Sequence, residues 1–299
     1  MYNGLNELLG ADKIKQNEPM SNHTTFKIGG PADVMVLPVT IADIKTTITY
    51  CRQNNHPLFI FGLGSNLVVR DKGIRGIVVK IGNNLKAVNV SGTEIYAQAG
   101  IRLSELARKA ADNALSGLEF AEGIPGSLGG AVVMNAGAYD GEIKDVVTEV
   151  EAISASGEER VFAAAEMDFS YRRSVFQHND YIIVAARMKL RPGAKPEIQS
   201  RMREYARSRR EKQPLEYPSA GSVFRRPPGY FVGPMIEKMG LKGYSIGGAQ
   251  VSEKHAGFII NTGDATAADV LDLIAMITKS AREQFGVELQ PEIRVVGEP

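Results

Sequence analysis

Two glycine-rich segments have the composition of a ligand-binding backbone. The first, Gly62-Leu63-Gly64-Ser65-Asn66, directly follows the apolar run Leu58–Phe61, which predicts a strand. Glycines after a strand let backbone N–H groups approach a phosphate closely, and the serine and asparagine add polar side chains. A dinucleotide-binding fold would need another glycine where Leu67 stands, and a Walker-type loop would need Gly-Lys-Ser/Thr, which the sequence lacks. Alone, this segment fits a tight turn as well as a phosphate-binding loop.

The second segment, Gly123–Tyr139 (GIPGSLGGAVVMNAGAY), is longer and more informative. It places five glycines within fifteen residues, mixed with apolar side chains. Repeated glycine costs backbone entropy on folding and adds little to a core, so it indicates backbone that must approach something closely. A glycine-rich structural loop is the alternative. The two segments together favour a ligand of dinucleotide size.

Three polar residues stand where a single side chain could take part in chemistry. Arg172 lies in Ser170–Ser174 (SYRRS), and a guanidinium suits a developing oxyanion, although an arginine there is usually a solvated surface charge. Ser222 follows two small residues, in a stretch that is also typical of a plain turn. Glu292 lies in Leu289–Val296, at the start of a terminal strand, where a glutamate is more often exposed than catalytic.

Composition limits the class of protein. The chain has 299 residues, enough for roughly two domains, and 43% of them are apolar, which excludes a wholly disordered protein. A formal net charge of +1 provides no overall field for nucleic acid or a membrane surface. A single cysteine, Cys51, indicates a reducing cytoplasm, and the four scattered histidines do not resemble a metal site. The N-terminus lacks a signal-peptide pattern, and no apolar run approaches the roughly 18 residues of a spanning helix.

The remaining sequence predicts strands and helices in irregular order. Strands are predicted near 32–37, 58–61, 67–69, 76–81, 94–100, 147–155, 160–163, 181–190 and 289–296, and helices over 40–51, 103–114, 197–212 and 266–285. Thr40 and Thr266 each begin a Thr-x-x-Asp helix start. Gly123–Tyr139 breaks every regular pattern, and Arg191–Pro196 is the best linker. The mixture predicts an α+β fold, without regular strand–helix alternation.

The helix predicted over 197–212 is strongly basic. A solvated helix face explains most of its arginines, but Lys212 at its end could serve an anionic substrate, because cations suit a helix C-terminus. Tyr205 is its one aromatic residue, so nucleic-acid binding is a poor explanation for the charge.

Seven stretches together resemble the UDP-N-acetylenolpyruvoylglucosamine reductase family of flavoenzymes. They follow the family's order from about residue 20 onward; each is weak alone, and the ordered set is highly specific. The stretches are Thr24–Asp33 (TTFKIGGPAD), Gly62–Asn66 (GLGSN), Gly123–Tyr139, Ser170–Ser174, Tyr217–Pro228 (YPSAGSVFRRPP), Gly247–Asn261 (GGAQVSEKHAGFIIN) and Pro291–Gly297 (PEIRVVG). The C-terminal part lacks an extra tyrosine-bearing loop and so resembles the shorter of the family's two types.

The resemblance implies a particular domain organisation. An FAD-binding domain of the vanillyl-alcohol-oxidase (PCMH) type, made of two subdomains, would span residues 20–196 after an N-terminal extension over 1–20. A smaller α+β substrate-binding domain would span 197–299. Its last strand, about 288–297, would return to the FAD domain and let Glu292 face the active site. We expect a cytoplasmic monomer without nucleic-acid, membrane or metal partners.

The resemblance also implies which residues bind and react. Arg172, Ser222 and Glu292 would be catalytic, and Tyr171, Lys212, Arg225, Lys254 and His255 would contact the UDP-sugar substrate. The segments implied to hold FAD contribute Gly62, Leu63, Gly64, Ser65, Asn66, Gly123, Ile124, Pro125, Gly126, Ser127, Gly129, Gly130, Asn135, Gly137 and Ala138. Neither segment contains His or Cys, so the flavin is expected to be non-covalent.

The implied reaction reduces an enolpyruvyl group in peptidoglycan precursor synthesis. NADPH would deliver hydride to FAD and leave, and the UDP-sugar would then receive hydride at C3 of its enolpyruvyl group. Arg172 and a protonated Glu292 would stabilise negative charge on the enolpyruvyl carboxylate, and Ser222 would protonate C2. Because serine is a weak acid, nearby cations or an ordered water must assist it.

Two alternatives stay open at this stage. The chain could be another FAD-dependent oxidoreductase of the same fold, or a non-catalytic flavin-binding module. Ser222 and Glu292, together with Ser170–Ser174, argue against the first alternative. The second would keep both glycine-rich segments but would have no use for Ser222.

Overall fold

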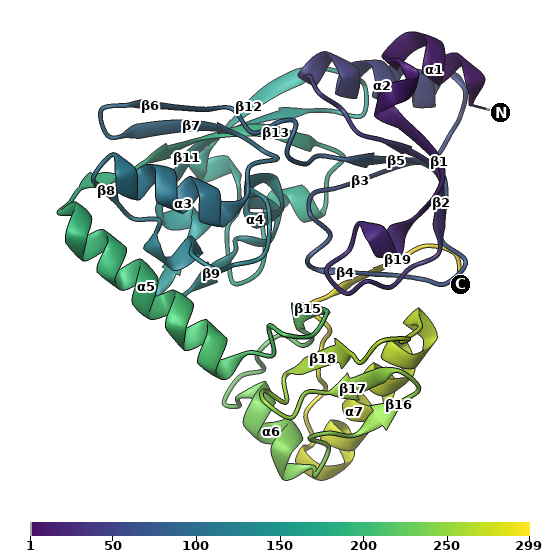
Figure 1. Ribbon diagram of the computed structural model, residues 1–299, viewed down its shortest axis with the longest axis vertical. Helices are drawn as coiled ribbons and strands as arrows, with labels where there is room; N and C mark the ends of the chain where they lie inside the picture. The colour runs from purple at the N-terminus through teal and green to yellow at the C-terminus, as the bar shows by residue number, and fades with distance from the viewer. Residues whose placement is uncertain (1) are drawn as a thin grey trace. The chain divides into compact units, whose positions relative to one another are not determined.

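Two separate clusters of buried apolar side chains organise the chain, which the computed structural model describes over residues 2–299 (Figure 1). They belong to two compact units. The first unit contains the N-terminal residues up to Gln16, with Val34–Leu63 and Gly76–Ser208. The second unit contains Asn17–Asp33, Gly64–Arg75 and Arg209–Pro299. Each unit therefore assembles its core from segments that are distant in sequence.

Helices and strands are mixed along the chain, which confirms the predicted α+β fold. The α-helices are α1 (Asn3–Leu9), α2 (Ile41–Gln53), α3 (Leu103–Asp112), α4 (Leu128–Met134), α5 (Lys195–Lys212), α6 (Val232–Lys238) and α7 (Ala267–Phe285). The 3₁₀ helices are η1 (Ala11–Lys13), η2 (Met20–Asn22), η3 (Glu119–Ala121), η4 (Ile143–Asp145), η5 (Ala164–Glu166) and η6 (Val175–Gln177). The strands are β1 (Ile14–Pro19), β2 (Pro31–Val36), β3 (Leu58–Phe61), β4 (Leu67–Val69), β5 (Ile74–Lys80), β6 (Val88–Ser91), β7 (Glu94–Gln98), β8 (Leu115–Ser116), β9 (Gly137–Ala138), β10 (Gly141–Glu142), β11 (Val147–Ile153), β12 (Glu159–Ala163), β13 (Ile182–Lys189), β14 (Arg191–Pro192), β15 (Ser219–Ser222), β16 (Ser245–Ile246), β17 (Ala249–Val251), β18 (Phe258–Asn261) and β19 (Arg294–Val296).

The largest sheet of the first unit has five antiparallel strands in the order β12-β11-β13-β7-β6. Its β11–β12 hairpin confirms the predicted one. A second sheet has the order β1-β2-β5-β3, with β3 and β5 parallel. Helices α1 and α2 lie side by side (Figure 1).

The second unit is built on a four-stranded antiparallel sheet, β15-β18-β17-β16, against which α7 packs. The terminal strand β19 pairs in parallel with β4, the strand that follows the first glycine-rich segment. Helix α7 begins at the predicted cap, where the Thr266 side chain accepts from the Asp269 amide. The amides of Ala267 and Ala268 also donate to the Asp71 carboxylate, at 2.8 and 3.1 Å. That carboxylate fastens the β4 segment to α7.

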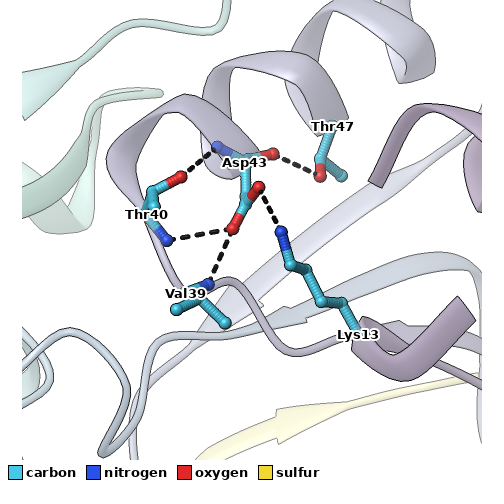
Figure 2. Close-up of polar contacts among 5 residues, drawn as sticks. All are labelled: Lys13, Val39, Thr40, Asp43 and Thr47. Atoms are coloured by element: carbon cyan, nitrogen blue, oxygen red, sulfur yellow. Dashed lines mark hydrogen bonds and ion pairs between the residues drawn. The ribbon is translucent and has the colours of Figure 1, made fainter. Parts of the chain in front are cut away.

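Helix α2 also begins at its predicted cap, and Figure 2 shows the contacts. The Thr40 hydroxyl accepts from the Asp43 amide at 3.1 Å, while the Asp43 carboxylate accepts from the amides of Thr40 and Val39 at 2.9 and 2.8 Å. Lys13 donates to the other carboxylate oxygen at 2.9 Å, and Thr47 donates to the Asp43 carbonyl. A local signal, Thr-x-x-Asp, thus fixes a buried carboxylate that anchors the N-terminal residues.

Several predicted elements need correction. The segment Gly123–Tyr139 is not free of regular structure, because it contains α4 and β9. The stretch around Ser222 is a strand, β15, and not a plain turn. In β13 the first five residues are all buried, so the predicted alternation holds only at its end.

The linker predicted at Arg191–Pro196 is also ordered. Its first residues form β14, which pairs with β8, and α5 already begins at Lys195, with Pro196 in the first turn where proline is tolerated. Strand β6 and helix α6 were not predicted.

Candidate active site

The two glycine-rich segments meet within the first unit at Gly62 and Ser127. A Cβ placed on Gly62 would clash with the Ser127 hydroxyl oxygen, so the glycine leaves room for this hydroxyl. Ser127 is 1% exposed, and its hydroxyl has no hydrogen-bond partner among residues 2–299. A buried hydroxyl usually has a partner, so this one, beside a backbone without a side chain, fits an oxygen-rich ligand such as a phosphate.

Other parts of the second segment bond to the protein itself. The amides of Leu128 and Gly129 donate to the carbonyls of Ile101 and Ala99, both at 2.9 Å, and the Gly126 carbonyl accepts from Leu103 at 3.0 Å. The first turn of α4 is therefore attached to the end of β7 and the start of α3. Its Leu128 and Gly129 amides are engaged and not directed at a ligand.

Asn135 ends α4 in a left-handed conformation and is fully buried. Its side-chain nitrogen donates to the Glu142 carboxylate at 2.7 Å and to the Ser170 carbonyl at 3.0 Å, and its oxygen accepts from the Lys144 amide at 3.0 Å. These bonds join the glycine-rich segment to the Arg172 turn. Direct contact of Asn135 with a cofactor stays a prediction.

Arg172 lies in a tight turn in which the backbones of Ser170 and Arg173 bond to each other in both directions at 3.1 Å. Its φ of 55° is unusual for a residue with a side chain. The Arg172 guanidinium donates to the Gly137 carbonyl at 3.1 Å and lies 5.0 Å from the ring centre of Tyr171, which is itself half-exposed. The structure thus brings predicted catalytic and cofactor-binding residues together.

Polar side chains of Ser174 and Gln177 stabilise the Arg172 turn. The buried Ser174 hydroxyl donates to the Val133 carbonyl at 2.7 Å, and the Gln177 amide donates to the Val133 and Arg172 carbonyls at 3.1 and 2.9 Å. The unusual conformation of Arg172 is therefore stabilised by several side chains.

In the second unit, the backbone of Val223 connects the neighbouring Ser222 to Glu292. The Val223 amide donates to Gly257 at 2.9 Å, and its carbonyl accepts from the Glu292 amide at 2.7 Å. Phe224 and Pro291 form a bridge beside them, and the Arg225 amide donates to Gln290 at 2.9 Å. Glu292 is half-buried, and its catalytic role stays a prediction.

The end of the first glycine-rich segment joins the same network. The Asn66 side chain donates to the Glu292 carbonyl at 3.1 Å, and the Asn66 carbonyl accepts from Arg294 at 2.9 Å. The Gly64 carbonyl accepts from the Thr25 amide at 3.1 Å, and the Thr25 hydroxyl donates to the Ser219 carbonyl at 2.7 Å. Glu292, Ser222 and the Gly64–Asn66 backbone therefore belong to one hydrogen-bonded framework.

His255 lies next to Ser222 in space. Its Nδ1 accepts from the Gly257 amide at 3.1 Å, which in a neutral ring places the proton on Nε2. Burial lowers the pKa of His255, with a smaller opposing effect of Glu237. A Cβ on Gly257 would lie 3.0 Å from His255 Cε1 and 3.6 Å from Ser222 Oγ, so the two side chains flank this glycine.

The other residues predicted to contact an anionic substrate differ in exposure. Lys212 is exposed at the end of α5, and Lys254 is exposed and pairs with Glu216 at 3.4 Å. Arg225 is half-buried, and its Nε is buried without a hydrogen-bond partner in the described part of the chain.

Three residues that position the site had no assigned role in the sequence. Thr25 connects Gly64 to β15, the buried Asn261 donates to the Phe26 carbonyl at 3.1 Å, and Asp71 caps α7. Thr25 and Asn261 lie in two of the seven stretches that resemble the family, and this position could have indicated a role for them. Asp71 carried no signal, because its bond is to a helix distant in sequence. Residues 2–299 contain no helix with the length and apolar character of a membrane span, and no cluster of metal-ligating side chains.

Known proteins are similar to this chain along its whole length. The family model for the C-terminal domain of UDP-N-acetylenolpyruvoylglucosamine reductase matches residues 213–296, and the model for an FAD binding domain matches residues 32–162. The UDP-N-acetylenolpyruvoylglucosamine reductase of Syntrophomonas wolfei is 58% identical over 298 residues, covering 100% of both chains. The protein of the same name from Caldanaerobacter subterraneus is 54% identical, covering 98% of this chain and 97% of its own. The crystal structure of UDP-N-acetylenolpyruvylglucosamine reductase from Thermus caldophilus matches with a TM-score of 0.80 at 36% identity, covering 93% of this chain and 97% of that one.

Proposed function

Because this chain belongs to the UDP-N-acetylenolpyruvoylglucosamine reductase family, we propose that it reduces the enolpyruvyl group of UDP-N-acetylglucosamine enolpyruvate to UDP-N-acetylmuramate. FAD is the cofactor, NADPH is the hydride donor, and the product is a peptidoglycan precursor. The observation that carries this conclusion is the full-length identity of 58% to a protein of that name. The two domain matches confirm the predicted FAD-binding domain followed by a distinct C-terminal domain.

The residues that would hold FAD are those of the two glycine-rich segments. Bound FAD supplies hydride transfer from NADPH to C3 of the enolpyruvyl group. The buried Ser127 hydroxyl fits a phosphate oxygen as acceptor, and the bare backbone of Gly62 leaves room beside it. Since the Leu128 and Gly129 amides are engaged by Ala99 and Ile101, the hydroxyl is the better candidate donor.

Arg172, Glu292 and Ser222 would act on the substrate itself. The Arg172 guanidinium, oriented by its bond to Gly137, would stabilise negative charge on the enolpyruvyl carboxylate, and a protonated Glu292 would donate a hydrogen bond to it. The Ser222 hydroxyl would give its proton to C2 and recover one from solvent. The Ser222 proton at C2 would complement the hydride that bound FAD would supply at C3, so that the double bond gains both.

The phosphates of the UDP-sugar require cations. Lys212, Arg225 and Lys254 are proposed to contact them, and the buried Arg225 Nε is a donor suited to a phosphate oxygen. Tyr171 is proposed to contact another part of the substrate. A cytoplasmic monomer, with an FAD-binding domain over 20–196 and a substrate domain over 197–299, remains part of the proposal.

A spectrum and a kinetic assay test this function. The purified protein should show the absorption bands of oxidised flavin, and the enolpyruvyl sugar nucleotide should accelerate its NADPH oxidation far more than simple sugars do. A different oxidoreductase would respond to another hydroxylated substrate instead. A flavin-binding module would show the bands without turnover, and a protein that stays colourless when offered FAD would contradict the proposal.

A further inference from the structure

We infer that His255 is a positioning residue for the Ser222 hydroxyl, acting through Gly257 by accepting a hydrogen bond at Nδ1. The inference rests on the proposed function, in which Ser222 donates a proton. It differs from the sequence-based expectation, which gives His255 a direct contact with substrate.

The Ser222 hydroxyl depends on its backbone for its position. It donates to the Phe224 carbonyl at 3.4 Å, well beyond the roughly 2.7 Å of a typical O–H···O bond. A bond of that length orients the hydroxyl weakly. The strand end that carries Ser222 must therefore be fixed by other contacts.

Gly257 supplies those contacts. Its carbonyl accepts from the Val223 amide at 2.9 Å, and Ser222 pairs with Phe258 between β15 and β18. The Gly257 amide has no strand partner in this arrangement and donates instead to His255 Nδ1 at 3.1 Å. The imidazole thus fixes the Ala256–Gly257 peptide group, which adjoins the Gly257 carbonyl that accepts from Val223, because an unpaired buried amide would favour rotation of that peptide group.

The imidazole is itself held firmly. The amides of Lys254 and His255 donate to the hydroxyl of Ser252, which is 1% exposed. The Phe258 ring packs edge-on against the imidazole with centres 5.0 Å apart. A Cβ on Gly233, in α6, would lie 3.4 Å from His255 Cε1, so α6 also packs against the ring. A ring held in this way can keep an acceptor at a fixed position.

The position of the acceptor on the ring makes the inference testable. In His255→Asn the side-chain oxygen can take the place of Nδ1, whereas in His255→Gln it takes the place of Nε2. If the Gly257 bond matters, asparagine preserves function better than glutamine. If His255 contacts the substrate through Nε2, glutamine is the better replacement.

The experiment measures both half-reactions of each variant by stopped flow, with the exposed His178 replaced by Asn and by Gln as matched controls. We expect reoxidation by the enolpyruvyl sugar nucleotide to fall by less than about threefold in His255→Asn and on the order of 10–100-fold in His255→Gln. The rate constant should change rather than KM, and flavin reduction by NADPH should stay within about twofold. Equal rates for the two variants, a faster His255→Gln, or a change confined to KM would overturn the inference.

A second measurement does not depend on activity. Long-range ¹H–¹⁵N spectra can report the tautomer of each of the four histidines, with the His255 signals identified by their loss in His255→Gln. We expect a proton on Nε2 and none on Nδ1, and a proton on Nδ1 would overturn the inference. If the wild-type protein fails to reduce the sugar nucleotide, the proposed function fails, while this spectrum still decides whether the Gly257 bond exists.

Discussion

The Arg172 turn of the first unit and the Ser222 strand end of the second are held in place by different kinds of bond. Around Arg172, the side chains of Asn135, Ser174 and Gln177 bond to backbone carbonyls and to a carboxylate. Around Ser222, backbone groups bond to each other, as in the bonds of Val223 to Gly257 and to Glu292. Arg172 is therefore positioned by hydrogen bonds from side chains, and Ser222 is positioned by strand pairing.

This difference predicts how each region responds to substitution. Removing the Ser222 hydroxyl leaves its backbone bonds intact, so the loss should be chemical only. Removing a side chain beneath the Arg172 turn leaves buried groups unpaired, so the fold and the chemistry should suffer together. Rate and stability, measured on the same variants, can separate the two cases.

The largest effect is expected for Ser222→Ala. Reoxidation by the sugar nucleotide should fall by about 10³-fold or more, since the proton donor to C2 is lost, while flavin reduction by NADPH continues. The free energy of unfolding should change by less than about 0.5 kcal/mol. Stopped-flow measurement of both half-reactions, with Ser219→Ala in the same strand as control, checks this. Equal losses in both half-reactions would remove Ser222 from the role of proton donor.

A fall of about 10²–10³-fold in reoxidation is expected for Arg172→Ala, because the enolpyruvyl carboxylate loses its cation. The matched control is Arg173→Ala, at the exposed neighbour that pairs with Asp168 at 3.4 Å. The control should change reoxidation by less than about twofold, since Arg173 is exposed and its ion pair with Asp168 contributes little to the stability of the turn. If Arg172→Ala reoxidises as fast as the wild type, Arg172 is an ordinary surface charge.

The contrast between these regions also marks what the sequence could predict. The helix starts at Thr40 and Thr266 were predictable, because a capping box is a local pattern with its own hydrogen bonds. The strand β4 after Gly62–Asn66 was also predictable from a local pattern. Leu67 stands where a dinucleotide-binding turn into a helix would need glycine, so the apolar residues that follow continue as a strand. The candidate residues Arg172, Ser222 and Glu292 came from motifs that resemble a family, and their chemical roles remain predictions.

Other features depend on contacts that no local pattern records. Helix α4 was missed because two glycines weaken helix propensity, and because its cap residue Ser127 makes no side-chain capping bond; burial stabilises it instead. The parallel pairing of β19 with β4 and the Val223–Glu292 bond join segments far apart in sequence. Only the fold shows that Asn66 reaches Glu292 and that Asn135 supports Ser170.

Asn135→Ala tests the side-chain-supported region by stability. Its amide makes hydrogen bonds to Glu142, Ser170 and Lys144 while 0% exposed, and alanine would also be strained at its left-handed φ of 41°. We expect the free energy of unfolding to fall by about 3 kcal/mol. Urea unfolding checks this, with the exposed Asn113→Ala as control, which should lose under about 1 kcal/mol. A loss below about 1 kcal/mol for Asn135→Ala would mean that the turn does not depend on its buried network.

The smallest effect is expected for Asp43, whose hydrogen-bonded network at the start of α2 has no proposed catalytic role. Asp43 is 8% exposed; burial raises its pKa, but Lys13 and the amides of Val39 and Thr40 outweigh burial, so the pKa is lowered overall. The folded state therefore binds this proton more weakly than the unfolded state. The resulting stabilisation is complete above the unfolded pKa of about 3.9 and disappears as pH falls through the lower folded value.

Asp43→Asn should consequently lose about 1–2 kcal/mol of unfolding free energy near neutral pH, and progressively less as the pH approaches about 3. Urea unfolding across this pH range measures the loss, with the exposed Asp180→Asn as the matched removal of a carboxylate. Both half-reactions should stay within about twofold of the wild type, because Asp43 caps α2 and lies in neither candidate catalytic region. A loss independent of pH would show that the charge of Asp43 adds nothing to its hydrogen bonds. A large loss of reoxidation would show that side-chain networks of the first unit affect the chemistry even when they do not support the Arg172 turn.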